Sequence, residues 1–198
     1  MKKLELSDVK NIYDYEKVRE EVRRRIIDLK RRRRVQVGKH LCFVFENRET
    51  ALFQIQEMCR VERIVDKAKI REEVEVYNDL IPGENELSAT LLIEIEDRAE
   101  IQPVLDRLMG IDAGEHLWIQ AGKEYAIPAQ FEPGHSDAER GKLSAVHFVR
   151  FAFRPEAIEA FKKQDAYLVV DHPGEKARMR IPDEVKASLL DDLSSEGG

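Results

Sequence analysis

Apolar positions in the first eighty residues recur at the spacing of helices. One stripe, with intervals of 3, 4, 4 and 3 residues, fits a 3.6-residue period and predicts a long helix over residues 15–34. Polar residues typical of N-caps, Asn47 and Asp66, precede two further periodic segments and predict helices to about residue 62 and to residue 81. The stripe of the first helix consists of Tyr15, Val18, Val22, Ile26 and Leu29.

A period of two replaces the helical period elsewhere. Alternating side chains predict strands over residues 35–45, with a break at Gly38, and over residues 87–95. Helices dominate the first half and strands the second, which predicts an α+β fold: a helical N-terminal half with a mixed, largely antiparallel sheet in the C-terminal half. In that second half we expect hairpins over residues 116–131 and 166–181, a strand over 143–153, and helices over 97–109, 155–163 and 182–193.

Composition narrows the class of protein. With 42% hydrophobic residues and a net charge of −6, the 198-residue chain is too apolar and too weakly charged for a disordered protein. No apolar run exceeds five residues, so no membrane helix is expected, and the N-terminus lacks the apolar segment of a secretory signal. Two cysteines make no disulfide framework. We therefore expect a cytoplasmic globular protein with one domain over residues 1–193 and a disordered tail over 194–198.

The charge is distributed unevenly along the chain. Residues 1–40 hold 14 basic and 7 acidic side chains, a net charge of +7, so the remaining 158 residues carry −13. Eight basic residues lie between Arg23 and Arg34, and such a cluster is typical of an anion-binding face for nucleic acid or an acidic partner. The candidate anion-binding residues are Arg24, Arg25, Arg31, Arg32 and Arg34.

A structural role for this basic run is the favoured alternative. Glu20, Glu21 and Asp28 each precede an arginine by four residues, the favourable orientation for ion pairs along a helix. Arginines near a helix C-terminus also complement its dipole, and the acidic remainder of the chain supplies a docking surface. Nucleic-acid binding is therefore disfavoured, and we expect the basic helix to be solvated or docked on the chain's own acidic body.

A second candidate site lies where the strand ending near residue 45 runs directly into a helix. Exposed N–H groups at a helix N-terminus favour an anion, and polar side chains gather there. The alternative, which we favour, is a capped strand–helix connection with ordinary polar side chains. The candidate ligand-binding residues are Glu46, Asn47, Arg48, Gln54 and Glu57.

Motifs for metal, nucleophilic or cofactor chemistry are absent from the sequence. His40 and Cys42 share one side of a strand, but no set of four ligands has a recognised spacing, so we expect no metal and no cofactor. No catalytic residue can be assigned, because the sequence has no GxSxG, GxGxxG or P-loop pattern. The polar segment 131–142, with His135, Ser136, Asp137 and Arg140, is interpreted either as a binding loop or as a mobile hairpin connection.

Four blocks of the sequence carry a resemblance to a known family. They are residues 44–50 (VFENRET), 53–58 (FQIQEM), 77–91 (YNDLIPGENELSATL) and 170–173 (VDHP). In this order they resemble a bacterial family of about this length, domain of unknown function 3501. The family has no assigned activity or catalytic residues to transfer. Its members are similar in being encoded beside rubrerythrin-like and iron–sulfur oxidoreductase proteins, which implies an accessory place in oxidative-stress redox metabolism.

Three functional hypotheses follow from these observations. The favoured one is a cytoplasmic accessory or interaction protein with a redox protein partner, able to form a homodimer through the long first helix. The second is an enzyme or ligand-binding protein with an anion or metal site at the turn Glu46–Arg48. The third is nucleic-acid binding through residues Arg23–Arg34.

Overall fold

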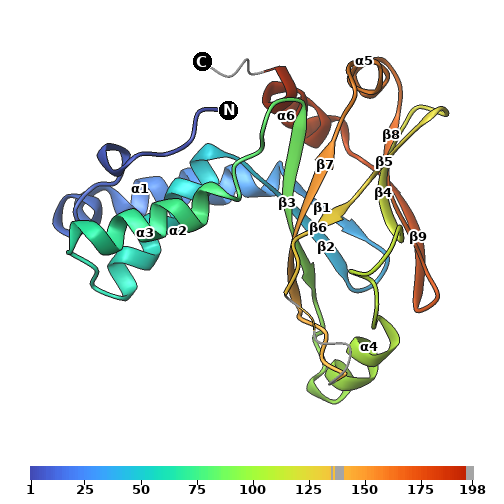
Figure 1. Ribbon diagram of the computed structural model, residues 1–198, viewed down its shortest axis with the longest axis horizontal. Helices are drawn as coiled ribbons and strands as arrows, with labels where there is room; N and C mark the ends of the chain where they lie inside the picture. The colour runs from blue at the N-terminus through green and yellow to red at the C-terminus, as the bar shows by residue number, and fades with distance from the viewer. Residues whose placement is uncertain (135, 137–140, 195–198) are drawn as a thin grey trace.

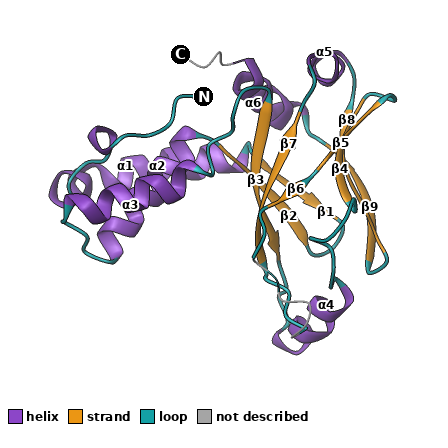
Figure 2. Cartoon of the chain, in the orientation of Figure 1, coloured by secondary structure: helices purple, strands orange, loops and turns teal. Residues whose placement is uncertain are grey.

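The computed structural model describes residues 1–134, 136 and 141–194 (Figure 1). A bundle of three helices extends from one side of two facing β-sheets, and shorter helices close the ends of the sheets (Figures 1 and 2). Residues 195–198 of the predicted tail and five residues of the polar segment, among them His135, Asp137 and Arg140, lie outside the described residues; residue 194 of the predicted tail is the last residue of a helix. None of the helices described is long and apolar enough to cross a membrane.

The helical bundle, here called the arm, consists of α1 (Ile12–Arg31), α2 (Arg48–Val61) and α3 (Lys67–Asn78). Asn47 and Asp66 cap α2 and α3 with side-chain oxygens that accept from backbone N–H groups, which confirms both predicted N-caps. The arm has an apolar cluster of its own, separate from the core between the sheets. Its buried members are Leu4, Ala51, Ile55, Cys59, Val74, Leu80 and Ile81.

The larger sheet has the strand order β1-β2-β3-β7-β6, and every described pairing in it is antiparallel. The smaller sheet has the order β5-β4-β8-β9 and is antiparallel throughout its described pairings. The strands of the larger sheet are β1 (Arg34–Val37), β2 (Leu41–Glu46), β3 (Glu86–Ile93), β6 (Gln130–Phe131) and β7 (Val146–Ala152). Those of the smaller sheet are β4 (Leu117–Ala121), β5 (Tyr125–Pro128), β8 (Ala166–His172) and β9 (Glu175–Arg180).

The main core lies between the two sheets. Alternation along β2 directs Leu41, Phe43 and Phe45 inward, and Phe43 and Phe45 lie against Phe151 of β7. Three helices add buried side chains to this core and cover its ends (Figure 1). They are α4 (Ile101–Arg107), α5 (Pro155–Lys163) and α6 (Asp183–Ser194).

The α+β fold class is confirmed, with two differences in arrangement. Three strands of the larger sheet, β1, β2 and β3, lie in the two first-half segments predicted as strands, so this sheet is not confined to the C-terminal half as expected. The predicted helix over residues 97–109 is divided into a 3-10 turn, Arg98–Glu100, and α4. Since proline lacks an N–H, starting α4 at Ile101 places Pro103 in the first turn, where no hydrogen bond is lost.

Candidate functional site

The site begins with Arg33, which follows α1 and is 1% exposed. Its guanidinium donates to the carbonyl oxygens of Phe45 (2.8 Å) and Glu46 (3.1 Å) at the end of β2. The same group donates to Ser188 Oγ (2.9 Å) and pairs with the buried carboxylate of Asp192, both on α6. Arg33 therefore fixes the end of β2 against α1 and α6, and this position determines where the Glu46 side chain lies.

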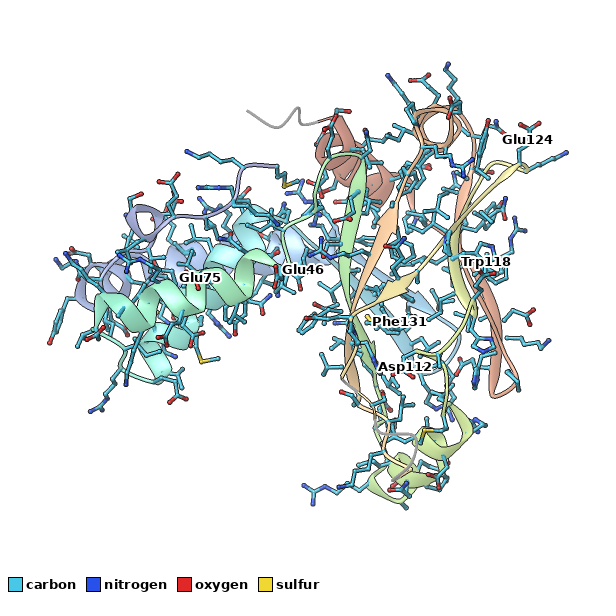
Figure 3. All side chains as sticks on the ribbon, in the orientation of Figure 1. Glu46, Glu75, Asp112, Trp118, Glu124 and Phe131 are labelled. Atoms are coloured by element: carbon cyan, nitrogen blue, oxygen red, sulfur yellow. The ribbon has the colours of Figure 1, made fainter. Side chains whose placement is uncertain are left out.

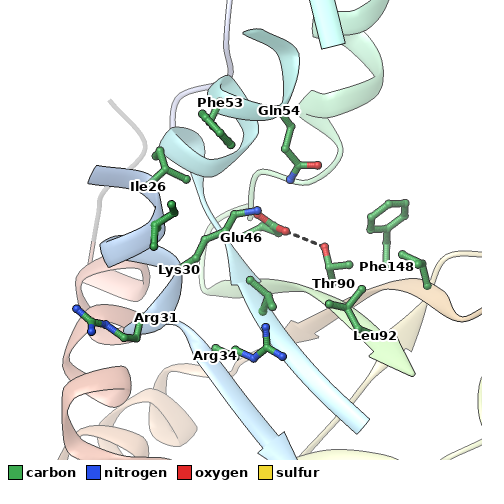
Figure 4. A pocket seen from close by; sticks show the side chains of 13 residues that line it. Ile26, Lys30, Arg31, Arg34, Glu46, Phe53, Gln54, Thr90, Leu92 and Phe148 are labelled. Atoms are coloured by element: carbon green, nitrogen blue, oxygen red, sulfur yellow. Dashed lines mark hydrogen bonds between the residues drawn. The ribbon is translucent and has the colours of Figure 1, made fainter. Parts of the chain in front are cut away.

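A cavity of about 550 Å³ lies between the outer face of the larger sheet and the arm (Figure 4). Its floor is formed by outward side chains of β2, β3 and β7, and its walls by the last turns of α1, the first residue of β1 and the first turns of α2. The lining is mainly apolar, with a few polar groups among it, as is typical of small-molecule sites. The floor consists of Val44, Glu46, Thr90, Leu92, Val146 and Phe148, and the walls of Ile26, Ile27, Lys30, Arg31, Arg34, Phe53 and Gln54.

Glu46 is a buried acidic residue in this mainly apolar cavity. It lies at the junction of the arm and the larger sheet (Figure 3) and is 2% exposed. One carboxylate oxygen, Oε1, accepts from Thr90 Oγ1 at 2.8 Å, whereas Oε2 is shielded from solvent and has no hydrogen-bond partner among the described residues. A buried carboxylate with an unsatisfied oxygen costs free energy, so a donor at this oxygen would be strongly favoured.

Two further polar side chains of the cavity also lack partners. In the described part of the chain, neither the Lys30 ammonium nor the Gln54 amide forms a hydrogen bond or ion pair. Both side chains extend into the space around Glu46 (Figure 4). The guanidinium groups at the rim are occupied: Arg34 donates to both oxygens of Glu94 (2.6 and 2.7 Å), and Arg31 donates to Asp28 (3.0 Å).

The residues predicted at the strand–helix turn are only partly brought together. Glu46 and Gln54 line the cavity, but Asn47 caps α2 in a reciprocal capping box with Thr50. Arg48 pairs with Asp8 at 2.7 Å, outside the cavity. Asn47 and Arg48 therefore serve the connection and its packing, as the favoured structural interpretation of this turn expects.

Glu57 belongs to a different network, between α1 and α2. Arg19 donates to both of its carboxylate oxygens (2.8 and 2.9 Å), and Tyr15 Oη and Arg60 donate to it as well (2.8 and 3.2 Å). These hydrogen bonds, led by that of Arg19, lower the pKa of Glu57 to about 2. Its hydrogen bonds are directed to the arm itself, and the residue does not line the cavity.

The basic run is largely engaged with acidic or backbone groups of the same chain. Arg25 lies 3.5 Å from Glu49 of α2, and Arg32 lies 3.9 Å from Glu184 of α6. Arg24 Nε donates to the Glu20 carbonyl oxygen of its own helix at 3.3 Å. Together with the pairs of Arg31, Arg33 and Arg34, these contacts involve six of the eight basic residues of the run; the anion-binding role of the run stays a prediction.

His40 and Cys42 lie away from the cavity lining. His40 Nδ1 is 3.1 Å from Glu175 Oε2, at the turn that connects β1 and β2. Cys42 is fully buried, and burial raises the pKa of its thiol to about 11. Over the residues that the structure describes, no group of three His, Cys, Asp or Glu side chains is placed to hold a metal ion.

Most of the cavity residues were missed by the sequence reasoning, although a signal was present. On β3 the predicted buried side is residues 87, 89, 91 and 93, so Leu92 is an apolar residue on the side expected to be polar. On β2 the second side, Cys42 and Val44, is also apolar and continues to Glu46. Strands that are apolar on both sides indicate a second covered face.

Comparison with known proteins gives a family and a fold relative. The family model described as "Protein of unknown function (DUF3501)" matches residues 3–193. A crystal structure at 1.90 Å resolution of a novel protein of unknown function from Burkholderia pseudomallei K96243 is 32% identical, with a TM-score of 0.89. The match covers 98% of this chain and 100% of that chain. No curated protein matches the chain.

Proposed function

Since the chain belongs to the DUF3501 family, whose description assigns no activity, we propose from its own cavity that it is a binding protein for a small, mainly apolar organic molecule. One observation carries this proposal. The buried Glu46 carboxylate has an oxygen without a hydrogen-bond partner in the described part of the chain, and it lies in a cavity whose other walls are largely apolar. The few polar groups that a ligand needs for its orientation are thus already in place.

The volume and lining of the cavity set the size of the ligand. A cavity of about 550 Å³ falls within the range of roughly 300–1,000 Å³ that small-molecule sites occupy. Leu92 and Phe148 of the floor and Phe53 of the wall offer apolar contacts for a ring or a branched chain. A molecule of one ring with a short polar extension matches both the volume and the polar groups.

The test uses 3-phenylpropan-1-ol, a neutral probe with one ring and one hydroxyl. Titrated into the full chain and followed by amide chemical shifts in NMR, it should shift signals of residues in β2, β3 and the start of α2. Val146→Trp fills part of the cavity from its floor, at a position that is 40% exposed, and it should abolish these shifts. Val76→Trp, at a 65% exposed position of α3, is the matched control and should leave them unchanged.

Two results would contradict the proposal. One is the absence of localised shifts in the wild-type protein at the solubility limit of the probe. The other is binding that Val146→Trp and Val76→Trp affect equally, because the probe would then occupy a surface other than the cavity.

The redox association implied by the family resemblance stays a prediction beside this proposal. A ligand-binding role is compatible with an accessory protein, because the cavity uses only one face of the larger sheet. Affinity purification from the native host under oxidative conditions checks the association. Recovery of a rubrerythrin-like or iron–sulfur protein supports it, and recovery of none contradicts it; the predicted homodimer is checked by sedimentation.

A further inference from the structure

The charges inside the cavity indicate the head group of its ligand. We infer that the ligand is a small zwitterion with an apolar side chain, the chemical class of apolar α-amino acids, with its ammonium on Glu46 and its carboxylate on Lys30. This inference rests on the proposed function and makes it more specific.

Two charged side chains of the cavity, Glu46 and Lys30, have no ion-pair partner among the described residues. Arg31 and Arg34 at the rim are paired with Asp28 and Glu94, so their charges are compensated within the chain. Glu46 and Lys30 carry opposite charges in the same cavity, and no ion pair joins them among the described residues. A purely cationic ligand would leave Lys30 uncompensated, and a purely anionic ligand would leave Glu46 uncompensated. A zwitterion compensates the charge of Glu46 with its ammonium and the charge of Lys30 with its carboxylate.

The second step is the direction of the hydrogen bonds. Glu46 Oε2 only accepts when ionised, and it needs a donor, which an ammonium supplies. Lys30 only donates, and it needs an acceptor, which a carboxylate supplies. Gln54, which lines the same cavity, both donates and accepts and so matches either end of the head group.

The third step is access to the shielded oxygen. Glu46 Oε2 is covered in the unliganded protein, so a neighbouring side chain must move when a ligand reaches it. Lys30 and Gln54 are only partly buried, and no described contact holds their polar ends. These two long side chains can therefore change rotamer at a small cost in free energy and then donate hydrogen bonds to the carboxylate of the ligand.

The experiment compares three probes that share one ring and differ in charge: L-phenylalanine, phenethylamine and 3-phenylpropanoate. Isothermal titration calorimetry at low salt measures their affinities for the full chain. We expect L-phenylalanine to bind most tightly, since each lost charge-assisted contact weakens binding roughly ten- to hundredfold. Glu46→Gln keeps the hydrogen bond from Thr90, so it should fold normally while its affinity for L-phenylalanine falls to that of 3-phenylpropanoate.

Lys30→Met provides the reciprocal test. It should reduce the affinity for L-phenylalanine and leave phenethylamine unaffected or more tightly bound. Glu75→Gln on α3 and Lys162→Met on α5 remove the same charges from exposed positions and should change nothing (Figure 3 labels Glu75).

The outcomes separate this inference from the proposed function. If phenethylamine or 3-phenylpropanoate binds best, the zwitterion is wrong while small-molecule binding in the cavity stands. If none of these probes binds and 3-phenylpropan-1-ol also fails, both the proposed function and the inference are overturned. If L-phenylalanine binds equally to wild type, Glu46→Gln and Lys30→Met, its site lies elsewhere and the inference is wrong.

Discussion

Replacement of Arg33 by methionine tests how the site is held in place. The Arg33 and Asp192 side chains are 1% and 6% exposed, so the variant leaves the Asp192 carboxylate buried without its guanidinium partner. Removal of one member of a buried pair costs roughly 3–5 kcal/mol, a large share of the roughly 5–15 kcal/mol by which a domain is stable. The hydrogen bonds to Phe45 O and Glu46 O are lost as well, which loosens the end of β2.

The pH dependence of this loss follows from Asp192. Burial raises the pKa of this carboxyl above its ordinary value of 3.8, although Arg33 acts in the opposite direction. The folded state thus binds the proton more tightly than the unfolded state, and stability falls as pH rises from 3.8 through the folded pKa. Without Arg33 that pKa rises further, so the Arg33→Met penalty should be larger at pH 7 than at pH 5.

Urea unfolding followed by circular dichroism measures the effect, with the midpoint lowered and the slope unchanged. The double variant Arg33→Met/Asp192→Leu removes both charges and should be more stable than Arg33→Met alone, because no buried carboxylate remains. An Arg33→Met stability within about 1 kcal/mol of wild type would refute the cost assigned to loss of the buried Arg33–Asp192 pair, given the range expected for such pairs. A double variant less stable than Arg33→Met would also refute it. The same holds for a destabilisation by Arg33→Met that becomes larger as the pH is lowered.

Three further predictions concern the arm and the basic run. The lowered pKa of Glu57 stabilises the fold above its unfolded value of 4.5 and is lost as pH falls towards 2, so Glu57→Gln should lower the melting temperature at pH 7 and much less at pH 3; an equal loss at both would contradict the network with Arg19. Asn47→Ala removes the cap of α2 and should cost about 1 kcal/mol in urea unfolding, whereas an unchanged midpoint would show that the capping box is not stabilising. Because most arginines of the basic run form ion pairs or hydrogen bonds within the chain, duplex DNA should not bind at 50 mM salt in an anisotropy titration, and tight binding that weakens steeply with salt would contradict the docked interpretation.

The sequence predicts local structure well because its determinants are local. N-caps at Asn47 and Asp66, and the turns at Gly38 and Gly122, both with positive φ, follow from residue chemistry at single positions. The burial of Arg33, by contrast, depends on residues far away in the sequence. Four arginines in a row, 31 to 34, are chemically equivalent, and burial of the third depends on Ser188 and Asp192, more than 150 residues away.

The candidate site could be predicted only in part for the same reason. Glu46 and Gln54 could be predicted from the sequence because they lie close to the strand–helix turn, where ligands are expected. Lys30, Thr90 and Phe148 join them only through the pairing of β3 with β2 and β7 and through the packing of α1 over that face. Such contacts between distant segments leave little trace in a single sequence beyond the second apolar side of each strand.

A crystal structure of the full chain soaked with L-phenylalanine tests the central claim most directly. We expect electron density for the ring against Leu92 and Phe148, with the ammonium within hydrogen-bond distance of Glu46 Oε2 and the carboxylate within that distance of Lys30 Nζ. An empty cavity in which Lys30 itself pairs with Glu46, at a concentration of L-phenylalanine that saturates the soak, would contradict it.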